Sequence, residues 1–515
     1  MKKLMFLLFC PIFTYGQFWT STEYKGAFPV TDGTTQTDWS HGWSNFDAEN
    51  TIYPQTITTH SSDITTNTTL SGVVLLQNKV YVTNNSTLTI LPGTIIRGDY
   101  QTQGTLIVTK GSKIIAEGTQ ENPIIFTSNE EVGNRAEGDW GGLVILGRAT
   151  NNQPNGVANI EGIPPTSNTE YGGGDDLDNS GILKYVRVEF AGIPLEPNKE
   201  INGITFGSVG SGTIVDYVQV SFSGDDSFEW FGGTVNCKHL IAYKGIDDDF
   251  DTDFGYRGNI QFGLAIRDLN RSDAPGDSNC FESDNDATGS SNLPQTAAIF
   301  SNITTVGPLG DGTNLLPEGE KFEKAFRLRR NTSISIFNSL VTGWEKGLSI
   351  EGTATEENVN SGNLVFSNNT LTSTESNCVT ASVDFYGFFS ENNNDSLALV
   401  SDINWVDIFS SNPDARLNPN STASTGADFS NSKFGGQVSV KENGIISNVQ
   451  LYPNPTSDVL NISGNGMLNV NLFNTQGQLV LNMQSWNYSQ FDVSRLQSGI
   501  YVVQVNDQFE KIVID

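Results

Sequence analysis

Short runs in which apolar and polar residues alternate recur along most of the chain, and glycine or asparagine closes many of them. Clear examples are Thr-Leu-Thr-Ile at 87–90, Thr-Leu-Ile-Val at 105–108 and Ile-Ile-Phe-Thr at 124–127. A period of two is typical of a strand with one buried face. Long stretches with helical periodicity are hard to find. The pattern therefore predicts an all-β protein.

Some of these runs repeat at a nearly constant spacing. The segments I-T-F-G, E-W-F-G and T-D-F-G begin at residues 204, 229 and 252, so their Phe-Gly pairs are 25 and 23 residues apart. A period in the low twenties with two or three strands per unit indicates one coil of a right-handed parallel β-helix, a solenoid. One coil is unstable alone, but a stack of coils buries a continuous apolar column. A β-sandwich with chance similarities is the alternative.

The same pattern divides the chain into five parts. Residues 1–16 combine two lysines, a short apolar run and a final glycine, which is typical of a signal peptide. Residues 17–69 contain three tryptophans and are expected to cap the open end of the column, where strand edges would otherwise be unpaired. Residues 70–404 are predicted to form the parallel β-helix, and residues 405–447 a C-terminal cap and linker. Residues 448–515 alternate again, with N-T-Q-G and Q-S-G turns, and predict a small antiparallel β-sandwich like an immunoglobulin domain.

Charge narrows the choice of partners. The chain has 28 basic and 58 acidic side chains, a formal net charge of −30, and loss of Lys2 and Lys3 with the signal peptide would bring it to about −32. Phosphate binding needs clustered lysine and arginine, so nucleic acid and anionic membrane surfaces are disfavoured. Cations and neutral partners such as glycans are favoured. The N-terminal apolar run is too short to cross a bilayer, and we expect no membrane-spanning segment in the mature chain.

The cysteine and histidine residues give little evidence for a disulfide framework or a metal site. Beyond the signal peptide the chain has three cysteines, Cys237, Cys280 and Cys378, which allow at most one intramolecular disulfide. Whether any two of them pair is left open by the sequence. No cluster of cysteine and histidine with metal-ligand spacing is present, which argues against a zinc site.

One acidic run stands out. Residues 245–258 read G-I-D-D-D-F-D-T-D-F-G-Y-R-G, and a second acidic pair lies one predicted coil, 22 residues, earlier. Two carboxylates about 5 Å apart repel by roughly 0.8 kcal/mol in water and about 3 kcal/mol at an effective dielectric of 20. We expect the run on the outside of a coil, at a turn that water and a divalent ion can reach. The candidate metal ligands are Asp225, Asp226, Asp247, Asp248, Asp249, Asp251 and Asp253.

Calcium suits such a set because it takes six to eight oxygen ligands in tolerant geometry. The run is not an EF-hand, because Thr252 and Gly258 stand where that loop needs glycine and glutamate. The alternative is a plain solvated ladder, or one paired with Arg257 and Arg267. Acids further along the chain, such as Glu282 and Asp284, would extend either kind of ladder over neighbouring coils.

A catalytic interpretation is also open. A lyase acting on uronates needs a metal and a base beside it, for which Lys244, Arg257 and Arg267 are the candidates. A hydrolase needs two carboxylates at a set separation, which the pairs at 225–226 and 247–248 would supply. Trp230 either stacks on a sugar ring at a substrate-binding surface or fills the core.

Two parts of the chain resemble known protein families. Three phrases, Y-P-N-P-T-S-D-V-L-N-I, L-F-N-T-Q-G-Q-L-V and L-Q-S-G-I-Y-V-V-Q-V, follow one another within residues 448–515. In that order they closely resemble the type A C-terminal sorting domain of the type IX secretion system. The resemblance implies contact with the secretion machinery and export across the outer membrane. It also implies that the protein is secreted or attached to the outer-membrane surface.

Residues 70–440 resemble a group of secreted parallel β-helix proteins. The shared phrases include L-P-G-T-I-I-R-G, G-D-W-G-G-L-V-I-L-G and F-E-S-D-N-D. More distantly, the architecture is similar to that of pectate lyases, but fold does not carry function. We expect first a surface-displayed protein that binds glycans or surfaces with acidic ladders and calcium. The alternatives are a polysaccharide lyase or hydrolase acting on extracellular polysaccharide, and a structural protein of the surface or matrix.

Overall fold

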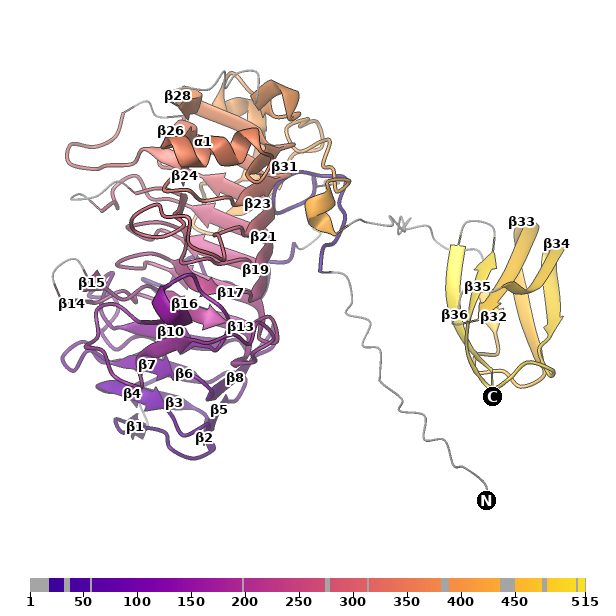
Figure 1. Cartoon of the computed structure of the whole chain (residues 1–515), viewed down its shortest axis with the longest axis horizontal. Helices are drawn as coiled ribbons and strands as arrows, with labels where there is room; N and C mark the ends of the chain where they lie inside the picture. Colours follow the sequence, from indigo (N-terminus) through magenta and orange to yellow (C-terminus); the bar gives the residue numbers. More distant parts are fainter. Residues whose placement is uncertain are drawn as a thin grey trace. The chain divides into compact units, whose positions relative to one another are not determined.

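The computed structural model (Figure 1) describes residues 18–31, 38–55, 58–196, 199–273, 278–312, 315–380, 389–435, 450–474, 479–505 and 508–514. The expected signal peptide lies outside these residues. The chain divides into two compact units, Met1–Gln437 and Val438–Asp515. The fold class predicted from the sequence is confirmed: the first unit is a parallel β-helix and the second is an antiparallel β-sheet domain.

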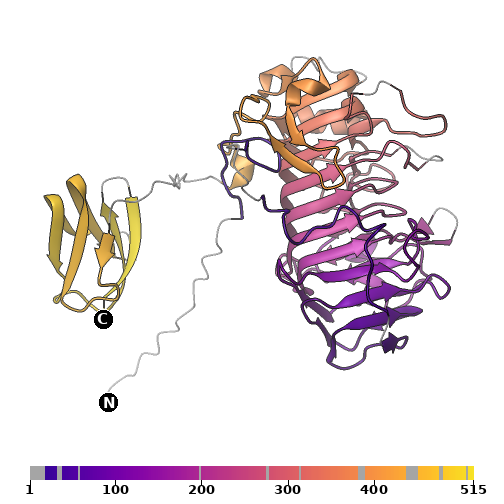
Figure 2. The ribbon, with the colours of Figure 1, turned by 180° about the vertical axis from the view of Figure 1, so that it is seen from behind.

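The first unit is a column of coils, each with up to three strands, and the strands of successive coils pair in parallel (Figures 1 and 2). We name the three faces sheets A, B and C. Sheet A contains β1 (Thr58–His60), β3 (Val73–Leu76), β6 (Ile95–Gly98), β9 (Ile124–Ser128) and β29 (Asp395–Ser396). Sheet B contains β4 (Lys79–Val82), β7 (Thr105–Val108), β10 (Gly142–Leu146), β16 (Ile204–Val209), β18 (Phe228–Gly233), β20 (Phe250–Asp253), β22 (Phe281–Ser283) and β24 (Lys324–Leu328). Sheet C contains β2 (Thr68–Leu70), β5 (Thr87–Ile90), β8 (Lys113–Glu117), β25 (Ser335–Phe337) and β27 (Val365–Ser367).

Seven longer strands bend and take part in two sheets. Five of them run from sheet C into sheet A: β13 (Gly181–Glu189), β17 (Ile214–Ser221), β19 (Asn236–Tyr243), β21 (Asn259–Ile266) and β23 (Ile299–Val306). Two run from sheet A into sheet B: β26 (Leu340–Ile350) and β28 (Thr370–Thr380). The remaining elements of this unit lie in loops and at its C-terminal end: β11 (Val157–Asn159), β12 (Glu170–Gly172), β14 (Pro194–Glu196), β15 (Lys199–Glu200), β30 (Trp405–Asp407), β31 (Asp414–Leu417), α1 (Thr353–Asn360) and short 3₁₀ helices at Pro154–Gly156, Val400–Ile403 and Ser432–Phe434.

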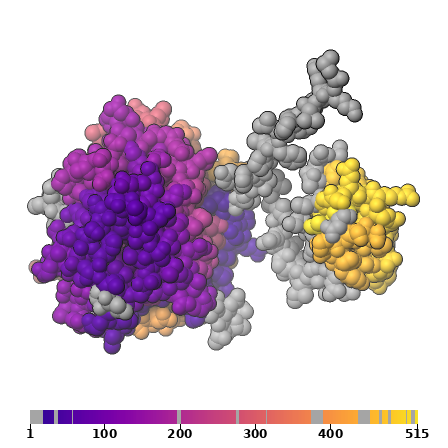
Figure 3. Space-filling model, turned by 90° about the horizontal axis from the view of Figure 1, so that it is seen from below, coloured from indigo at the N-terminus to yellow at the C-terminus, as the bar shows by residue number. Residues whose placement is uncertain are grey.

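Aromatic side chains stack along the inside of sheet B. The rings of Phe228 and Phe250 are 5.9 Å apart, those of Phe250 and Phe281 are 5.0 Å apart, and Phe326 follows at 4.7 Å. All four side chains are fully buried in one core that runs through the column. Repeating the same residue type at the same coil position therefore builds a continuous apolar stack. Figure 3 shows the end formed by the first coils, covered by indigo and purple atoms.

The observed register differs by one residue from the Phe-Gly alignment. Phe206 pairs with Trp230, and Phe231 pairs with Asp253. Because successive strand residues face opposite sides, a shift of one residue moves a side chain from one face to the other. Phe206 is therefore in the core, whereas Phe231 lies on the outside of sheet B, covered by Tyr171 of β12.

The bend between sheets C and A is built by residues with left-handed backbone. Tyr185, Tyr217, His239 and Phe262 have φ values of 50°, 56°, 51° and 65° in four successive coils. Their rings stack, with centroids 4.5, 4.3 and 5.1 Å apart. Left-handed backbone costs energy for residues with a side chain, and the mutual stacking offsets part of that cost. The result is an aromatic ridge along one flank of the column.

Residues 18–31 and 38–54 do not cover the open end of the column, as the sequence suggested, but lie along this flank. Trp19 packs on Phe434 near the last coils, and Lys25 forms an ion pair of 2.6 Å with Asp395. Further along, Trp43 packs against the ridge at Tyr185 and Tyr217. The indigo segment beside the orange coils in Figures 1 and 2 is the start of this path. The segment covers apolar flank residues that strand pairing leaves exposed.

The second unit contains β32 (Gln450–Tyr452), β33 (Val459–Asn474), β34 (Leu479–Asp492), β35 (Gly499–Val505) and β36 (Gln508–Ile514). All four pairings are antiparallel, and β33 pairs with β32, β34 and β35. Alternate residues of β33, including Leu460, Val470 and Leu472, fill a core of its own. No helix in the described part of the chain is long and apolar enough to span a membrane.

Candidate functional site: a carboxylate ladder between coils

The acidic residues gather where the chain leaves sheet A and enters sheet B. Phe222 and Lys244, at equivalent points of two coils, take left-handed backbone with φ of 56° each and start the turn. Glycine permits the turns to stack closely: a Cβ on Gly224 would lie 2.7 Å from the carbonyl oxygen of Gly192. The turns therefore align, so that Asp248 N–H donates to Asp226 Oδ1 at 2.9 Å. Acids 22 residues apart in sequence thus lie side by side.

The first strand residues after the turns continue the arrangement on the outer face of sheet B. Glu229, Asp251 and Glu282 occupy the same position of β18, β20 and β22. We define the carboxylate ladder as Asp225, Asp226, Glu229, Asp247, Asp248, Asp251 and Glu282.

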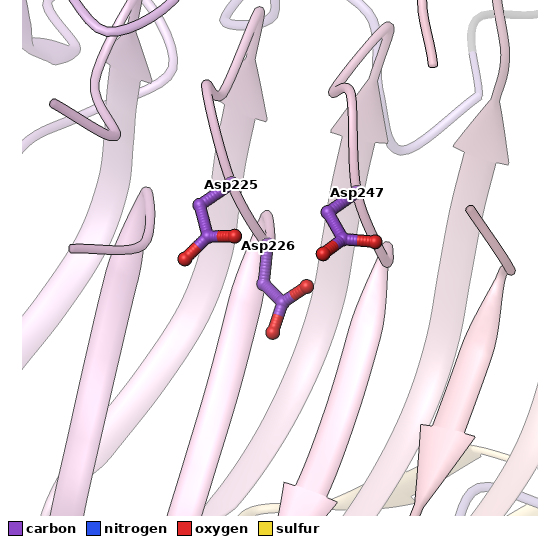
Figure 4. Close-up of side chains that lie close together, drawn as sticks. All are labelled: Asp225, Asp226 and Asp247. Carbon is purple, nitrogen blue, oxygen red and sulfur yellow. The ribbon is translucent and has the colours of Figure 1, made fainter. Parts of the chain in front are cut away.

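Three groups within the ladder have ligand oxygens that all lie within 4.8 Å of one another. They are Asp225 with Asp226 and Asp247, then Asp226 with Glu229 and Asp251, then Asp248 with Asp251 and Glu282. Figure 4 shows the first group, with Asp225 and Asp226 on one turn and Asp247 on the next. Because Asp226 and Asp251 each belong to two groups, the ladder is continuous.

Four ladder carboxylates are poorly compensated. Asp226, Glu229 and Asp248 are only 7%, 6% and 4% exposed. Burial, and then repulsion from neighbouring carboxylates, raises the pKa of each of these three groups and of Asp251 well above the usual range. Among the described residues, no lysine or arginine forms a salt bridge with any of the four, and Asp251 Oδ1 is buried without a hydrogen-bond partner. The apolar cover of β11 and β12 lies beside Glu229 on the same sheet face.

Glu282 ends the ladder differently. Arg327 occupies the next position of sheet B, and its Nη1 lies 3.2 Å from Glu282 Oε2. Arg329 forms ion pairs with both Glu282 and Asp284. Burial raises the pKa of Glu282, and these arginines partly oppose the shift. The negative ladder is therefore followed directly by fixed positive charge.

Asp249 has a partner of its own. Its Oδ2 accepts a hydrogen bond of 3.0 Å from Arg267 Nε, and both side chains are fully buried. The guanidinium also donates to the carbonyl oxygens of Gly245, Asp247 and Asn279. The structure thus corrects the expectation that the whole run lies on the outside of a coil within reach of water: Asp248 and Asp249 are buried. Asp249 neutralises Arg267 and lies outside the three groups.

Asp253 also lies outside the three groups. It accepts a hydrogen bond of 2.6 Å from the backbone N–H of Phe254. Burial raises the pKa of Asp253 well above its usual value. Of the seven predicted ligands, the structure therefore brings five together and leaves Asp249 and Asp253 aside.

The candidate catalytic bases are all engaged elsewhere. Lys244 forms an ion pair of 3.1 Å with Asp268, and Arg257 one of 3.1 Å with Asp176. Arg267 is buried against Asp249.

Trp230 is fully buried, with its ring stacked on those of Phe206 and Tyr256. Of the two alternatives for Trp230, it therefore fills the core, and it presents no exposed ring face on which a sugar could stack. Cys237 and Cys280 are buried and unbonded, and the Cys378 side chain lies outside the described part.

Glu229 is absent from the predicted ligand set, and Glu282 is expected from the sequence only as one of the later acids that could extend the ladder. The signal for Glu229 is present in the sequence, because it precedes Asp251 by the same 22 residues that separate Asp225 from Asp247. Glu282 follows Asp251 by 31 residues, because a longer turn separates β21 from β22. A constant period therefore misses it.

These features define the class of protein: a parallel β-helix with an acidic ladder on one edge, joined to a separate β-sheet domain. The chain belongs to the family of pectate-lyase-like beta helix domains, whose model matches residues 58–404. The model of the secretion system C-terminal sorting domain matches residues 450–515. The protein is therefore a type IX secretion substrate, secreted or attached to the outer-membrane surface, and its sorting domain interacts with the secretion machinery. Comparisons with curated proteins and with solved structures gave no match.

Proposed function

We propose that this protein is a surface-displayed, calcium-binding β-helix protein that attaches to extracellular glycans or surfaces. One observation carries the proposal: three neighbouring carboxylates are buried and a fourth, Asp251, is half-buried, and none of the four has a cationic partner among the described residues. Uncompensated buried charge is costly, so a ladder of this kind needs protons or a metal to neutralise it. At neutral pH outside the cell, a divalent cation supplies the positive charge that neutralises the carboxylates.

The donor set fits calcium. Carboxylate oxygens are hard ligands, and a calcium–oxygen distance of about 2.3–2.6 Å places ligands on opposite sides of an ion about 5 Å apart. The 4.8 Å limit within each group is compatible with one shared ion per group. The structure contains no cysteine or histidine in these groups, which disfavours softer metals. Asp226, Asp251 and the residues around them would hold the ion.

The attachment role is argued from the net charge of the protein and from the partial exposure of some ladder carboxylates. With a net charge of −30 the protein repels anionic partners unless cations intervene. One calcium ion per group would cancel most of the negative charge of the ladder, and coordination positions would remain open at its half-buried members. A rigid column on the cell surface would then display this edge to glycans.

The test is metal removal and return. The mature chain, residues 17–515, is treated with a chelator, and its thermal unfolding is followed as calcium is added. We expect the melting temperature to rise by several degrees, since a ligand at 100 times its Kd adds about 2.7 kcal/mol to folding stability. The double variant Asp226→Asn/Asp251→Asn is expected to lose the calcium response. The control Glu121→Gln/Glu131→Gln removes the same charge from exposed positions and is expected to keep it.

A calcium response that survives in Asp226→Asn/Asp251→Asn would contradict the proposed site. Retention of the calcium-loaded protein on immobilised polysaccharide, and its release by chelator, tests the attachment role separately. Calcium binding without retention on any polysaccharide would favour a purely structural surface protein.

A polysaccharide lyase is the second candidate, and one observation favours it. Arg327 and Arg329 stand beside the last ladder residue, with side chains 21% and 16% exposed, so cationic side chains adjoin the candidate metal site, although both are ion-paired with Glu282. Incubation with uronate polymers, with and without calcium, is checked by the absorbance of unsaturated products. The lyase predicts an absorbance increase that Arg327→Ala abolishes, whereas the attachment role predicts none.

A further inference from the structure

The buried acids of the carboxylate ladder have an asparagine on either side. In sheet B, Ile204 pairs with Phe228, Phe228 with Phe250, and Phe250 with Phe281. The residues that stand two positions before these four are, in order, Asn202, Asp226, Asp248 and Asn279. All four side chains are buried, and the two asparagines are 1% and 0% exposed. One row across four successive coils therefore reads amide, acid, acid, amide.

The amide of Asn202 contacts the ladder through one of its two polar atoms. Its Nδ2 donates to Glu229 Oε2 and, at 3.1 Å, to Thr205 Oγ1. Its Oδ1 is buried without a hydrogen-bond partner, as is Oδ1 of Asp251. A buried acceptor oxygen without a partner costs free energy. Because Glu229 and Asp251 belong to the same group of acids, a cation bound there would satisfy both oxygens.

Asn279 holds the equivalent place at the other end of the row. Its backbone N–H and its Nδ2 donate to Asp248 Oδ1 at 2.6 and 3.1 Å. Asn202 thus contacts the group that contains Glu229, and Asn279 contacts the group that contains Asp248. The carbonyl oxygen of asparagine is an ordinary calcium ligand, and it adds an oxygen without adding negative charge.

Charge sets the number of ions. Glu282 is already paired with Arg327 and Arg329. The ladder acids in these two groups that have no cationic partner among the described residues are Asp226, Glu229, Asp248 and Asp251. When ionised they carry four negative charges, which two divalent cations balance. A single divalent cation would leave two of those charges uncompensated.

The spacing of the strands provides a place for each ion. Glu229 and Asp251 face one another across the gap between β18 and β20, and Asp251 and Glu282 across the gap between β20 and β22. Neighbouring strands lie about 4.7–4.9 Å apart, so ions in the two gaps are separated by a distance that one carboxylate can bridge. We propose that the ladder holds a two-calcium centre, which Asp251 bridges and to which Asn202 and Asn279 each contribute an amide oxygen. This inference rests on the proposed calcium-binding function and specifies its ions.

The experiment counts the bound ions. The mature chain, residues 17–515, is freed of metal with a chelator and dialysed against radioactive calcium at a series of concentrations. We expect two ions per chain that bind more tightly than any further ion. Asn202→Leu removes the amide oxygen from one gap and is expected to raise the Kd of one of these ions by about tenfold or more. The other ion is expected to stay bound, and Asn279→Leu is expected to have the complementary effect.

A conservative variant separates a ligand from a structural side chain. Asn202→Asp keeps an oxygen at this position but loses the N–H groups that contact Glu229, and it is expected to retain both ions. A purely structural role in holding Glu229 predicts instead that the aspartate and leucine variants bind calcium equally poorly. The matched control is Asn151→Leu, which removes an amide that is 2% exposed and donates to Ser208 Oγ, outside the ladder. It is expected to keep both ions.

Terbium, which takes the same oxygen ligands as calcium, supplies a second measurement. Its luminescence lifetimes in light and heavy water report how many water molecules the bound ion carries. Asn202→Leu is expected to add about one water, since water takes the place of the amide oxygen. Asn202→Asp is expected to leave the number unchanged, and circular dichroism of each variant shows that it is folded.

Different results would contradict different parts of the argument. A wild-type chain that binds no calcium would overturn this inference together with the proposed function. A chain with one tight ion, or with three of equal affinity, would leave calcium binding in place and overturn the two-ion centre. Unchanged calcium affinity and unchanged hydration of terbium in Asn202→Leu would remove Asn202 from the ligands.

Discussion

At the scale of single residues, neighbouring acids of one short run play different roles. Asp249 is bonded to Arg267, and burial raises its pKa to about 6 even with the guanidinium opposing the shift. Asp248 and Asp251, on either side, have no such partner among the described residues. The sequence shows the acids but not this division, because which of them faces an arginine depends on the path of the turn.

The buried ion pair gives the first prediction. Arg267→Met would leave Asp249 charged and buried, and breaking a buried pair in this way costs about 3–5 kcal/mol of unfolding free energy. The matched control is Lys244→Met, which removes a partly exposed pair with Asp268 and is expected to cost about 0–1 kcal/mol. Urea unfolding measures both. Equal effects of the two substitutions would show that the Arg267 pair is not isolated from water.

Asp286 gives a prediction about pH. Burial alone would raise the pKa of its carboxyl, but hydrogen bonds from Ser290 and Thr288 outweigh burial and lower it. A carboxylate with a lowered pKa in the folded state stabilises the protein above the unfolded-state pKa of about 3.9 and loses that effect as pH falls through the folded-state value. Asp286→Asn is therefore expected to cost about 1–3 kcal/mol at pH 7 and progressively less below about pH 4. Urea unfolding at several pH values checks this, and a cost that stays constant down to pH 2 would contradict it.

At the scale of elements, the long N-terminal segment is what the sequence could least predict. Its three tryptophans correctly indicate that it packs on something, but the partners are far along the chain, as in the contacts of Lys25 with Asp395 and Trp19 with Phe434. No local pattern encodes such pairings. Alternating residues, by contrast, gave the parallel coils, because the inside and outside of a strand are set by its own sequence. Even there, strand register had to come from the structure.

Trp43 tests whether the N-terminal segment is held mainly by the aromatic ridge. The side chain is fully buried, packs against Tyr185 and Tyr217, and donates from Nε1 to Trp39 O at 2.8 Å. Trp43→Ala is expected to cost about 3–5 kcal/mol in the attachment of this segment. Hydrogen exchange and limited proteolysis are then expected to show faster exchange and cleavage within residues 38–55. Ile52→Ala, at an 85% exposed position of the same segment, is the control and should leave protection unchanged. Unchanged protection in Trp43→Ala would mean that other contacts hold the segment.

At the scale of the whole molecule, two cores serve two tasks. The column holds the carboxylate ladder, and the smaller unit is the sorting domain. The cores share no residue: one runs through the coils from Ile64 to Phe389, and the other lies among strands between Leu460 and Ile514. Sequence resemblance was most informative at this scale, because ordered phrases identify a domain even where single residues do not reveal its chemistry.

Separate cores predict separate folding. Residues 17–437 and residues 438–515, produced as two proteins, are each expected to unfold in a single cooperative transition, since each buries its own apolar residues. The larger piece is expected to keep the full rise in melting temperature on adding calcium, because all seven ladder residues lie within it. The smaller piece is expected to show no calcium response, because it contains none of the ladder residues. Scanning calorimetry of both pieces and of the mature chain measures the transitions. If the larger piece lost its calcium response on separation, the ladder would depend on the sorting domain, and a protein delivered to the surface without that domain could not function as proposed.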